Sequence, residues 1–266
     1  MEKMKQIVLS IMNEKGGVGK TTTATSLAYC LSKMGNSVCL VDFDGQSHST
    51  LQCGIQDPNR LNYTVSNVMD SIIENGTLPD RSKYIIRTSF GVDLVPANST
   101  LFSLESKLNI ISFREMKLKI LIDDLKQHYD FVIIDTMPAV GVMMVSVLMA
   151  CDYVIIPTQA EYLSAHGLVS LIQHIDSVKR IKSTLEVLGV VITMDTKNTI
   201  TSASMKAQLK NATNGMNIKI FSQVIPRSIK VSEAMLHSKI ICDYLPEHSV
   251  SKAYSSLANE VLNSIK

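Results

Sequence analysis

The sequence predicts an α/β fold with a mostly parallel central sheet and helices on both of its faces. Short, fully apolar, β-branched runs, which are typical of strands buried on both sides, alternate with longer amphipathic segments, which are typical of helices. The 266 residues, 45% of them hydrophobic, are enough for one large core, and neither a repeat nor a linker interrupts them. We therefore expect a single domain over residues 1–266.

The elements follow from these patterns in chain order. The expected strands are Gln6–Met12, Ser37–Asp42, Phe131–Asp135, Tyr153–Pro157 and Val187–Thr193. The expected helices are Lys20–Met34, Phe113–Gln127, Ser164–Ile181 and Lys252–Ile265. The region from 56 to 98 is less regular and reads as a surface insertion, with a helix near Thr64–Ile73 and short strands near Tyr84–Ile86 and Val92–Val95.

Composition excludes several classes of protein. The five cysteines form no C-x-x-C pair or Cys/His cluster, which argues against a disulfide framework and a cysteine metal site. The most apolar stretch, residues 139–151, is too short to span a bilayer as a helix. We expect a cytoplasmic protein.

A glycine-rich loop joins the first expected strand to the first expected helix. Its glycines allow backbone N–H groups to point at phosphate oxygens, and the helix N-terminus adds the positive end of a dipole. The expected phosphate-binding residues are Gly16, Gly17, Val18, Gly19, Lys20, Thr21 and Thr22. Lys20 is expected to neutralise the β- and γ-phosphates, and the Thr21 hydroxyl to bind Mg²⁺. This loop predicts a P-loop ATPase.

The loop departs from the ordinary P-loop pattern, which requires glycine at position 14. The chain has Glu14 there, followed by a second lysine, Lys15. A second cation stabilises the charge that develops on a transferred phosphoryl group. Lys15 could act in its own site or in that of a facing subunit; a lysine that merely points to solvent is the alternative.

Two carboxylates follow expected strands close to this loop. Asp44 lies just beyond the second strand, where it could orient the attacking water; capping of the turn at residues 47–50 is the alternative. Asp135 ends the apolar run that begins at Phe131, which is the Walker B pattern of a Mg²⁺ ligand.

These motifs resemble those of the ParA/MinD superfamily of P-loop ATPases, which have a deviant Walker A loop. The resemblance implies that Lys15 is the signature lysine, which crosses a dimer interface to the partner's ATP. It implies that Asp44 is the catalytic aspartate of switch I, although Gly45 stands where the family has proline. Residues 135–141 resemble switch II of the family, with Met137 in place of its first proline.

The resemblance continues beyond the two switches. Residues 155–161 are similar to the I-P-x-Q-x-E segment of the family, and residues 224–234 to its I-P-R…L-S-E-A segment. In the family the proline of this second segment borders the adenine. The similarity therefore implies that Pro226 and Met194 pack against the base.

Charge indicates a class of partner. Residues 197–239 contain seven basic residues and one acid, a net charge of +6 in a chain whose total is +2. The family's partition ATPases bind DNA without sequence specificity, for which contacts of basic side chains with phosphates suffice. The candidate DNA-binding residues are Lys206, Lys210, Arg227, Lys230 and Lys239. A solvated basic face is the alternative reading of this segment.

We thus expect a slow Mg²⁺-dependent ATPase that dimerises with ATP, binds nonspecific DNA, is nucleoid-associated in that state, and segregates a plasmid or chromosome. A ParB-like partner protein is expected to stimulate it. One alternative is a MinD-like membrane-cycling or other cargo-positioning ATPase. However, residues 252–266 carry lysine only at their ends, which favours a helix that docks on the core over a membrane anchor. A metallocluster enzyme similar to the nitrogenase iron protein is the second alternative, and it would require paired interface cysteines.

Overall fold

The central feature is a sheet whose strands are almost all parallel. The computed structural model describes residues 6–161, 164–196, 207–210, 213 and 215–265. In this part of the chain the strand order is β3-β4-β2-β5-β1-β6-β7, and only the β3–β4 pair is antiparallel. The strands are β1 Ile7–Ile11, β2 Val38–Phe43, β3 Ile86–Arg87, β4 Asp93–Val95, β5 Phe131–Thr136, β6 Tyr153–Gln159 and β7 Glu186–Thr193. The α/β fold class and all five long strands are confirmed.

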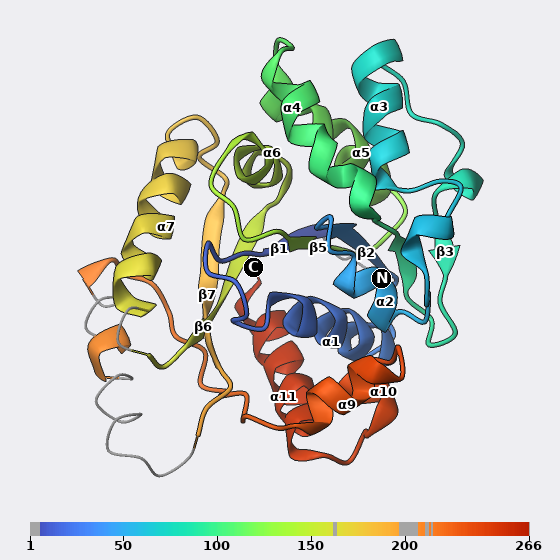
Figure 1. Cartoon of the computed structure of the whole chain (residues 1–266). Helices are drawn as coiled ribbons and strands as arrows, with labels where there is room; N and C mark the ends of the chain where they lie inside the picture. The colour runs from blue at the N-terminus through green and yellow to red at the C-terminus, as the bar shows by residue number, and fades with distance from the viewer. Residues whose placement is uncertain (1–5, 162–163, 197–206, 211–212, 214, 266) are drawn as a thin grey trace, which may run out of the picture.

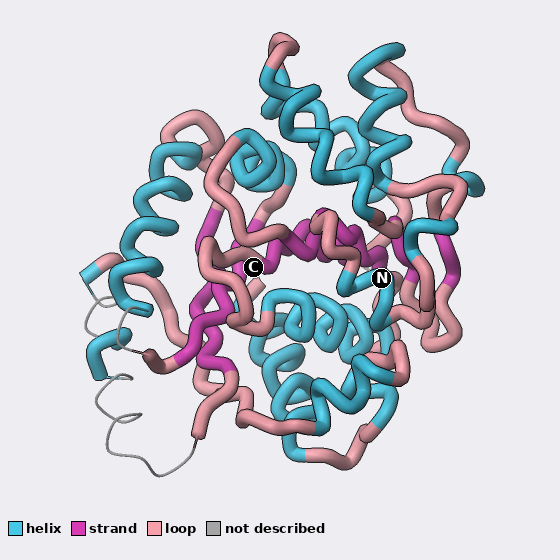
Figure 2. Tube along the Cα trace, viewed as in Figure 1, coloured by secondary structure: helices cyan, strands magenta, loops and turns pink. Residues whose placement is uncertain are grey.

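Helices cover both faces of this sheet (Figures 1 and 2). One layer contains α3 to α7, and the other contains α1, α9, α10 and α11. The described helices are α1 Lys20–Lys33, α2 His48–Gln52, α3 Val65–Asn75, α4 Leu104–Asn109, α5 Lys117–Lys126, α6 Val142–Ala150, α7 Ser164–Lys179, α9 Lys230–Leu236, α10 Ile241–Tyr244 and α11 Ser249–Ser264. Each layer has its own apolar core, because alternate residues of the strands point to opposite faces.

The helix and the two short strands expected within residues 56–98 are present as α3, β3 and β4, but the expectation that this region is a surface insertion is wrong. β4 pairs in parallel with β2, and Leu94 and Val95 are fully buried, so this region completes one edge of the sheet. Its irregular sequence reflects the brevity of β3 and β4, which are too short to show a period.

Two helix boundaries also differ from the prediction. Phe113 has a left-handed backbone with a φ of 54°, and a 3-10 turn over Arg114–Met116 precedes α5, so α5 begins four residues later than expected. α11 begins three residues earlier than expected, at Ser249, because the His248 side chain accepts a hydrogen bond from the Val250 N–H and caps it.

Strand register gathers the motifs at one edge of the sheet. Asp135 of β5 lies opposite Ile11 of β1 and Asp42 of β2. Because parallel strands end at the same edge, the loops after β1, β2 and β5 meet there.

Candidate functional site

The loop after β1 has the backbone that a phosphate cradle requires. Gly17 and Gly19 have φ values of 73° and 86°, in the left-handed region that favours glycine, and Gly19 is the N-cap of α1. Neighbouring strands hold the loop, since the Thr193 hydroxyl donates to the Val18 carbonyl at 2.7 Å and the Gln159 amide to the Gly17 carbonyl at 3.0 Å. The cradle is therefore already formed in the free chain.

Lys20 lies inside this loop. Its side chain folds back, and Nζ donates to the carbonyl oxygen of Lys15 at 2.9 Å. Burial lowers the pKa of the Lys20 ammonium, while the charges of Asp135 and Asp44 oppose that shift. A buried cation next to two carboxylates is suited to receive a polyanion.

Asp135 is fully buried at the end of β5. Its Oδ2 accepts a hydrogen bond from the Ser49 hydroxyl at 2.8 Å, whereas Oδ1 has no hydrogen-bond partner within the described ranges. Burial raises the pKa of this carboxyl to about 6, and the hydroxyls of Ser49 and Thr21 nearby act in the opposite direction. An orphaned buried carboxylate oxygen next to a threonine hydroxyl is a donor set that fits Mg²⁺.

Asp44 lies in a tight turn close to Lys20 and Asp135. It is 8% exposed, and its Oδ1 accepts the N–H of Gln46 at 2.9 Å. The alternative, in which Asp44 caps the turn at residues 47–50, is wrong, because it is Oδ2 of Asp42 that accepts the N–H of Thr50, at 2.8 Å, whereas the Asp44 carboxylate bonds Gln46. The Asp44 carboxylate lines the phosphate cavity, and its bond to Gln46 orients it.

The phosphate cavity has a volume of about 310 Å³. Its lining joins the P-loop to both switches: Gly16, Gly17, Gly19, Lys20, Thr21, Thr22, Asp44, Gln46, Pro138 and Met194 are among the residues on its wall. Lys15 is not one of the described residues that form this wall.

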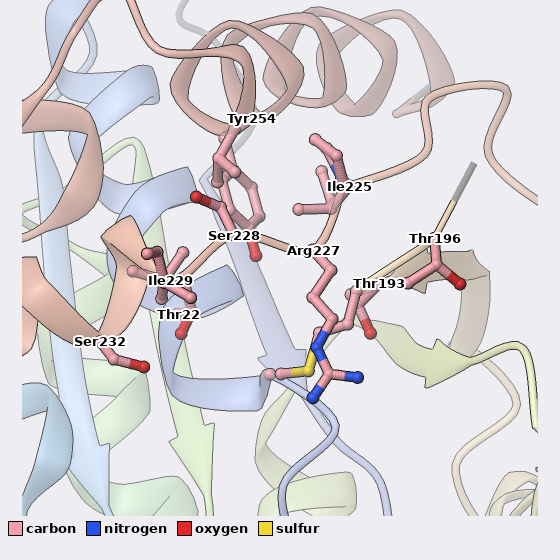
Figure 3. Close-up of a pocket in the computed structure, with 14 residues that line it drawn as sticks. Thr22, Thr193, Thr196, Ile225, Arg227, Ser228, Ile229, Ser232 and Tyr254 are labelled. Atoms are coloured by element: carbon pink, nitrogen blue, oxygen red, sulfur yellow. The ribbon is translucent and has the colours of Figure 1, made fainter.

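A second cavity of about 450 Å³ adjoins the first (Figure 3). The two share Gly19, Thr22 and Met194. Pro226 and Met194, which the resemblance places against the base, both line this second cavity, and the buried Tyr254 of α11 closes one side. The adjoining cavities match a nucleotide with its phosphates in one and its base in the other.

The Lys15 side chain points away from the phosphate cavity. Its Nζ pairs with Oε2 of Glu161 at 2.5 Å, and both side chains are about half exposed. The Glu14 carboxylate is directed at α7, where it accepts a hydrogen bond from Ser170 at 3.2 Å and lies 2.8 Å from Nδ1 of His174. The two residues that break the ordinary P-loop pattern are thus both held by the segment formed by the end of β6 and α7.

The candidate DNA-binding residues lie in different places. Lys206 lies outside the described residues. Lys210 is exposed in the segment 207–210, whose Leu209 packs in the same core as α7, and Lys239 is exposed after α9, which packs in the opposite core. Lys230 is the first residue of α9 and pairs with Glu233 at 2.6 Å. Arg227 lines the second cavity, next to Thr193 and Ser228 in Figure 3. In the described chain these residues do not form one cluster.

Comparisons with known proteins show the family of this chain. A family model described as an AAA domain matches residues 5–187. The sporulation initiation inhibitor protein Soj of Bacillus subtilis is 34% identical over 255 residues, which cover 96% of this chain and 97% of Soj. The chromosome partitioning protein ParA of Caulobacter vibrioides is 32% identical over 261 residues, which cover 96% and 94%. The chain belongs to the ParA/Soj family of ATPases.

A solved structure adds to this assignment. It is that of a Mycobacterium smegmatis protein described as cobyrinic acid a,c-diamide synthase, with bound ATP analogue and magnesium. The two structures match with a TM-score of 0.82 and 30% sequence identity, over 97% of this chain and 95% of the other. The Soj and ParA relatives make this chain a P-loop ATPase of the partition and positioning class. None of its described helices has the length and apolarity to cross a membrane.

Several residues of this ParA-family site were not among the predicted site residues. Ser49 bonds the carboxylate of Asp135, Glu161 holds Lys15, and Tyr254 lines the second cavity. The family-like I-P-x-Q-x-E pattern was the only sequence signal for any of them, since it includes Gln159 and Glu161. Ser49 and Tyr254 lie in segments without a motif.

Proposed function

We propose that this chain binds Mg²⁺-ATP, that ATP pairs two copies of it, and that the pair binds nonspecific DNA to segregate a replicon. ATP hydrolysis, stimulated by a ParB-like partner, separates the copies again. The observation that carries the proposal is the position of Lys15. It belongs to the phosphate-binding loop, yet its ammonium lies outside its own phosphate cavity, where a facing subunit could meet it.

Several residues of the two cavities would have roles in this reaction. Lys20 and the backbone N–H groups of residues 16–22 would bind the phosphates and stabilise the charge that develops during transfer to water. Asp44, oriented by its bond with Gln46, would align the attacking water. Met194 and Pro226 would pack on the base.

Thr21 and Asp135 would hold Mg²⁺. The free Oδ1 of Asp135 supports this role, as does the magnesium bound with an ATP analogue in the Mycobacterium smegmatis protein. When bound, the ion supplies positive charge to the phosphate oxygens.

The membrane-cycling alternative has less support. The apolar residues of α11 are buried against α1 in the core, so this helix does not present an apolar face to a bilayer. Basic side chains at several exposed positions support DNA instead, because nonspecific binding requires only contacts with phosphates.

DNA retention across a salt series tests this proposal. We expect the chain to shift a nonspecific duplex in a gel with ATP and far less without it, and the binding to weaken steeply with salt because counterions are released. Lys230→Gln and Lys210→Gln should each weaken binding at every salt concentration and lower the salt slope by about 1. Lys119→Gln on α5, whose lysine is paired with Asp123, is the matched control and should bind as the parent does.

Retention that is independent of ATP or insensitive to salt would contradict the proposal. If retention depends on ATP but neither variant changes it, the DNA face lies elsewhere on the molecule.

A further inference from the structure

The turn after β2 is tightly packed at Gly45, directly after Asp44. A Cβ added to Gly45 would lie 2.8 Å from Cε1 of Phe102 and 2.9 Å from Cδ1 and Cζ. Carbon atoms in contact are about 3.5–4.0 Å apart, so no side chain fits here while the ring is present. Gly45 is not among the residues with positive φ, so the ring, and not the backbone, is what requires glycine.

The backbone of Phe102 is well anchored, although the residue is 49% exposed. It lies in a 3-10 turn over Ser99–Ser103, whose first turn is capped by Asn98 through the Thr100 N–H at 3.2 Å. Its neighbours Leu101 and Leu104 are 2% and 1% exposed in the core that lies between the sheet and α3 to α7. The backbone that carries the ring over the turn is thus anchored on both sides.

We propose that Phe102 is a positioning residue for Asp44. Its ring occupies the space that a side chain at position 45 would fill and holds the switch I turn in place. The Asp44 carboxylate then keeps the orientation given by Gln46. This inference rests on the proposed role of Asp44 in aligning water.

The same segment also contacts the second switch. A Cβ added to Gly141, the N-cap of α6, would lie 2.5 Å from Oε1 of Glu105 in α4. The loops that carry Asp44 and Pro138 into the phosphate cavity are thus both packed against residues 102–105. This arrangement supports a positioning role for the segment, since one stretch of chain packs against both loops.

A size-exchange experiment tests the proposal. ATP affinity and single-turnover hydrolysis are measured for the full chain and for Phe102→Ala, Gly45→Ala and the double variant. We expect either single change to slow hydrolysis about ten- to a hundredfold, since small misplacements of a positioning group have such effects. ATP affinity should stay within about twofold, because neither residue is among those that line the nucleotide cavities. The double variant should recover most of the rate, because the new Cβ then has room.

Two reference variants complete the design. Asp44→Ala gives the full effect of losing the carboxylate, and Phe113→Ala, which removes a ring that is 80% exposed, should hydrolyse ATP as the parent does. If Asp44→Ala is slow but Phe102→Ala is not, the positioning role is overturned and the role of Asp44 stands. If Asp44→Ala keeps the parental rate, both are overturned. Slow hydrolysis by Phe102→Ala that Gly45→Ala does not rescue also overturns the positioning role.

Discussion

Lys15 and Glu161 form the contact that bears most directly on how this ATPase would work. Their atoms lie 2.5 Å apart across 146 positions of sequence, and both side chains are about half exposed. Ion pairs exposed to this degree stabilise a fold by about 0–1 kcal/mol. The pair is thus strong enough to set the rest position of Lys15 and weak enough to release it to a facing ATP.

Replacing Glu161 with Gln should therefore promote pairing of two copies. In this variant the release of Lys15 no longer breaks an ion pair in either subunit. With ATP present, we therefore expect half-maximal dimerisation at a protein concentration about three- to tenfold lower than for the parent. Without ATP, Lys15 should react faster with an amine reagent, as measured by mass spectrometry. Asp123→Asn is the matched control, because Asp123 is as exposed as Glu161 and lies as close to its own lysine, Lys119. Dimerisation that is unchanged or weaker in Glu161→Gln would show that this glutamate does not restrain Lys15.

At the scale of single residues, the sequence predicted those parts of the site that are neighbours in the chain. Gly17, Gly19 and Lys20 are neighbours in the chain, so their spacing alone places them in one loop. The partners of the loop come from distant segments: Phe102 packs on Gly45 and Glu161 pairs with Lys15. A single sequence contains no periodic signal for contacts of this kind.

Among the elements, α2 joins switch I to the sheet. Thr50 of α2 donates its N–H and its hydroxyl to Oδ2 of Asp42, at 2.8 and 2.7 Å, and its hydroxyl oxygen accepts the N–H of Ala97 at 3.0 Å. Burial raises the pKa of the Asp42 carboxyl, and the two bonds from Thr50 oppose this shift. One threonine thus ties β2, α2 and the segment after β4 together.

Thr50→Val keeps the shape of this side chain and removes its hydroxyl. We expect the free energy of unfolding, measured with urea, to fall by about 1–3 kcal/mol, because the buried Ala97 N–H loses its partner and Asp42 loses a donor. Ser71→Ala removes an exposed hydroxyl bond to Thr77 and should change stability by less than about 0.5 kcal/mol. Equal losses in the two variants would mean that the Thr50 network contributes nothing beyond an ordinary surface bond.

The predictability of the elements follows their length and burial. β1, β5 and β6 are continuous apolar runs and were predicted to within two residues at each end. α2 and α10 have five and four residues, too few to show a helical period, and no helix was predicted there. α6 lies within the recognised apolar stretch from 139 to 151, but a run that is apolar on all sides does not reveal its period.

At the scale of the whole molecule, the parallel sheet explains why one edge carries the chemistry. Strands separated by about a hundred residues end side by side, so Lys20 and Asp44 line one cavity and the buried Asp135 lies close to Lys20. Such a site fits a process in which ATP serves as the contact between two subunits. The pairing, and not the hydrolysis itself, is then the central event.

Sedimentation of the full chain with Mg²⁺-ATP tests this claim most directly. We expect a monomer without nucleotide and a dimer with ATP under conditions of slow hydrolysis. Lys15→Ala should bind ATP with affinity within about twofold of the parent, because Lys15 lies outside its own cavity, yet remain a monomer. Lys117→Ala on α5 is the control and should dimerise as the parent does. A Lys15→Ala chain that still forms the ATP-dependent dimer would contradict the shared site.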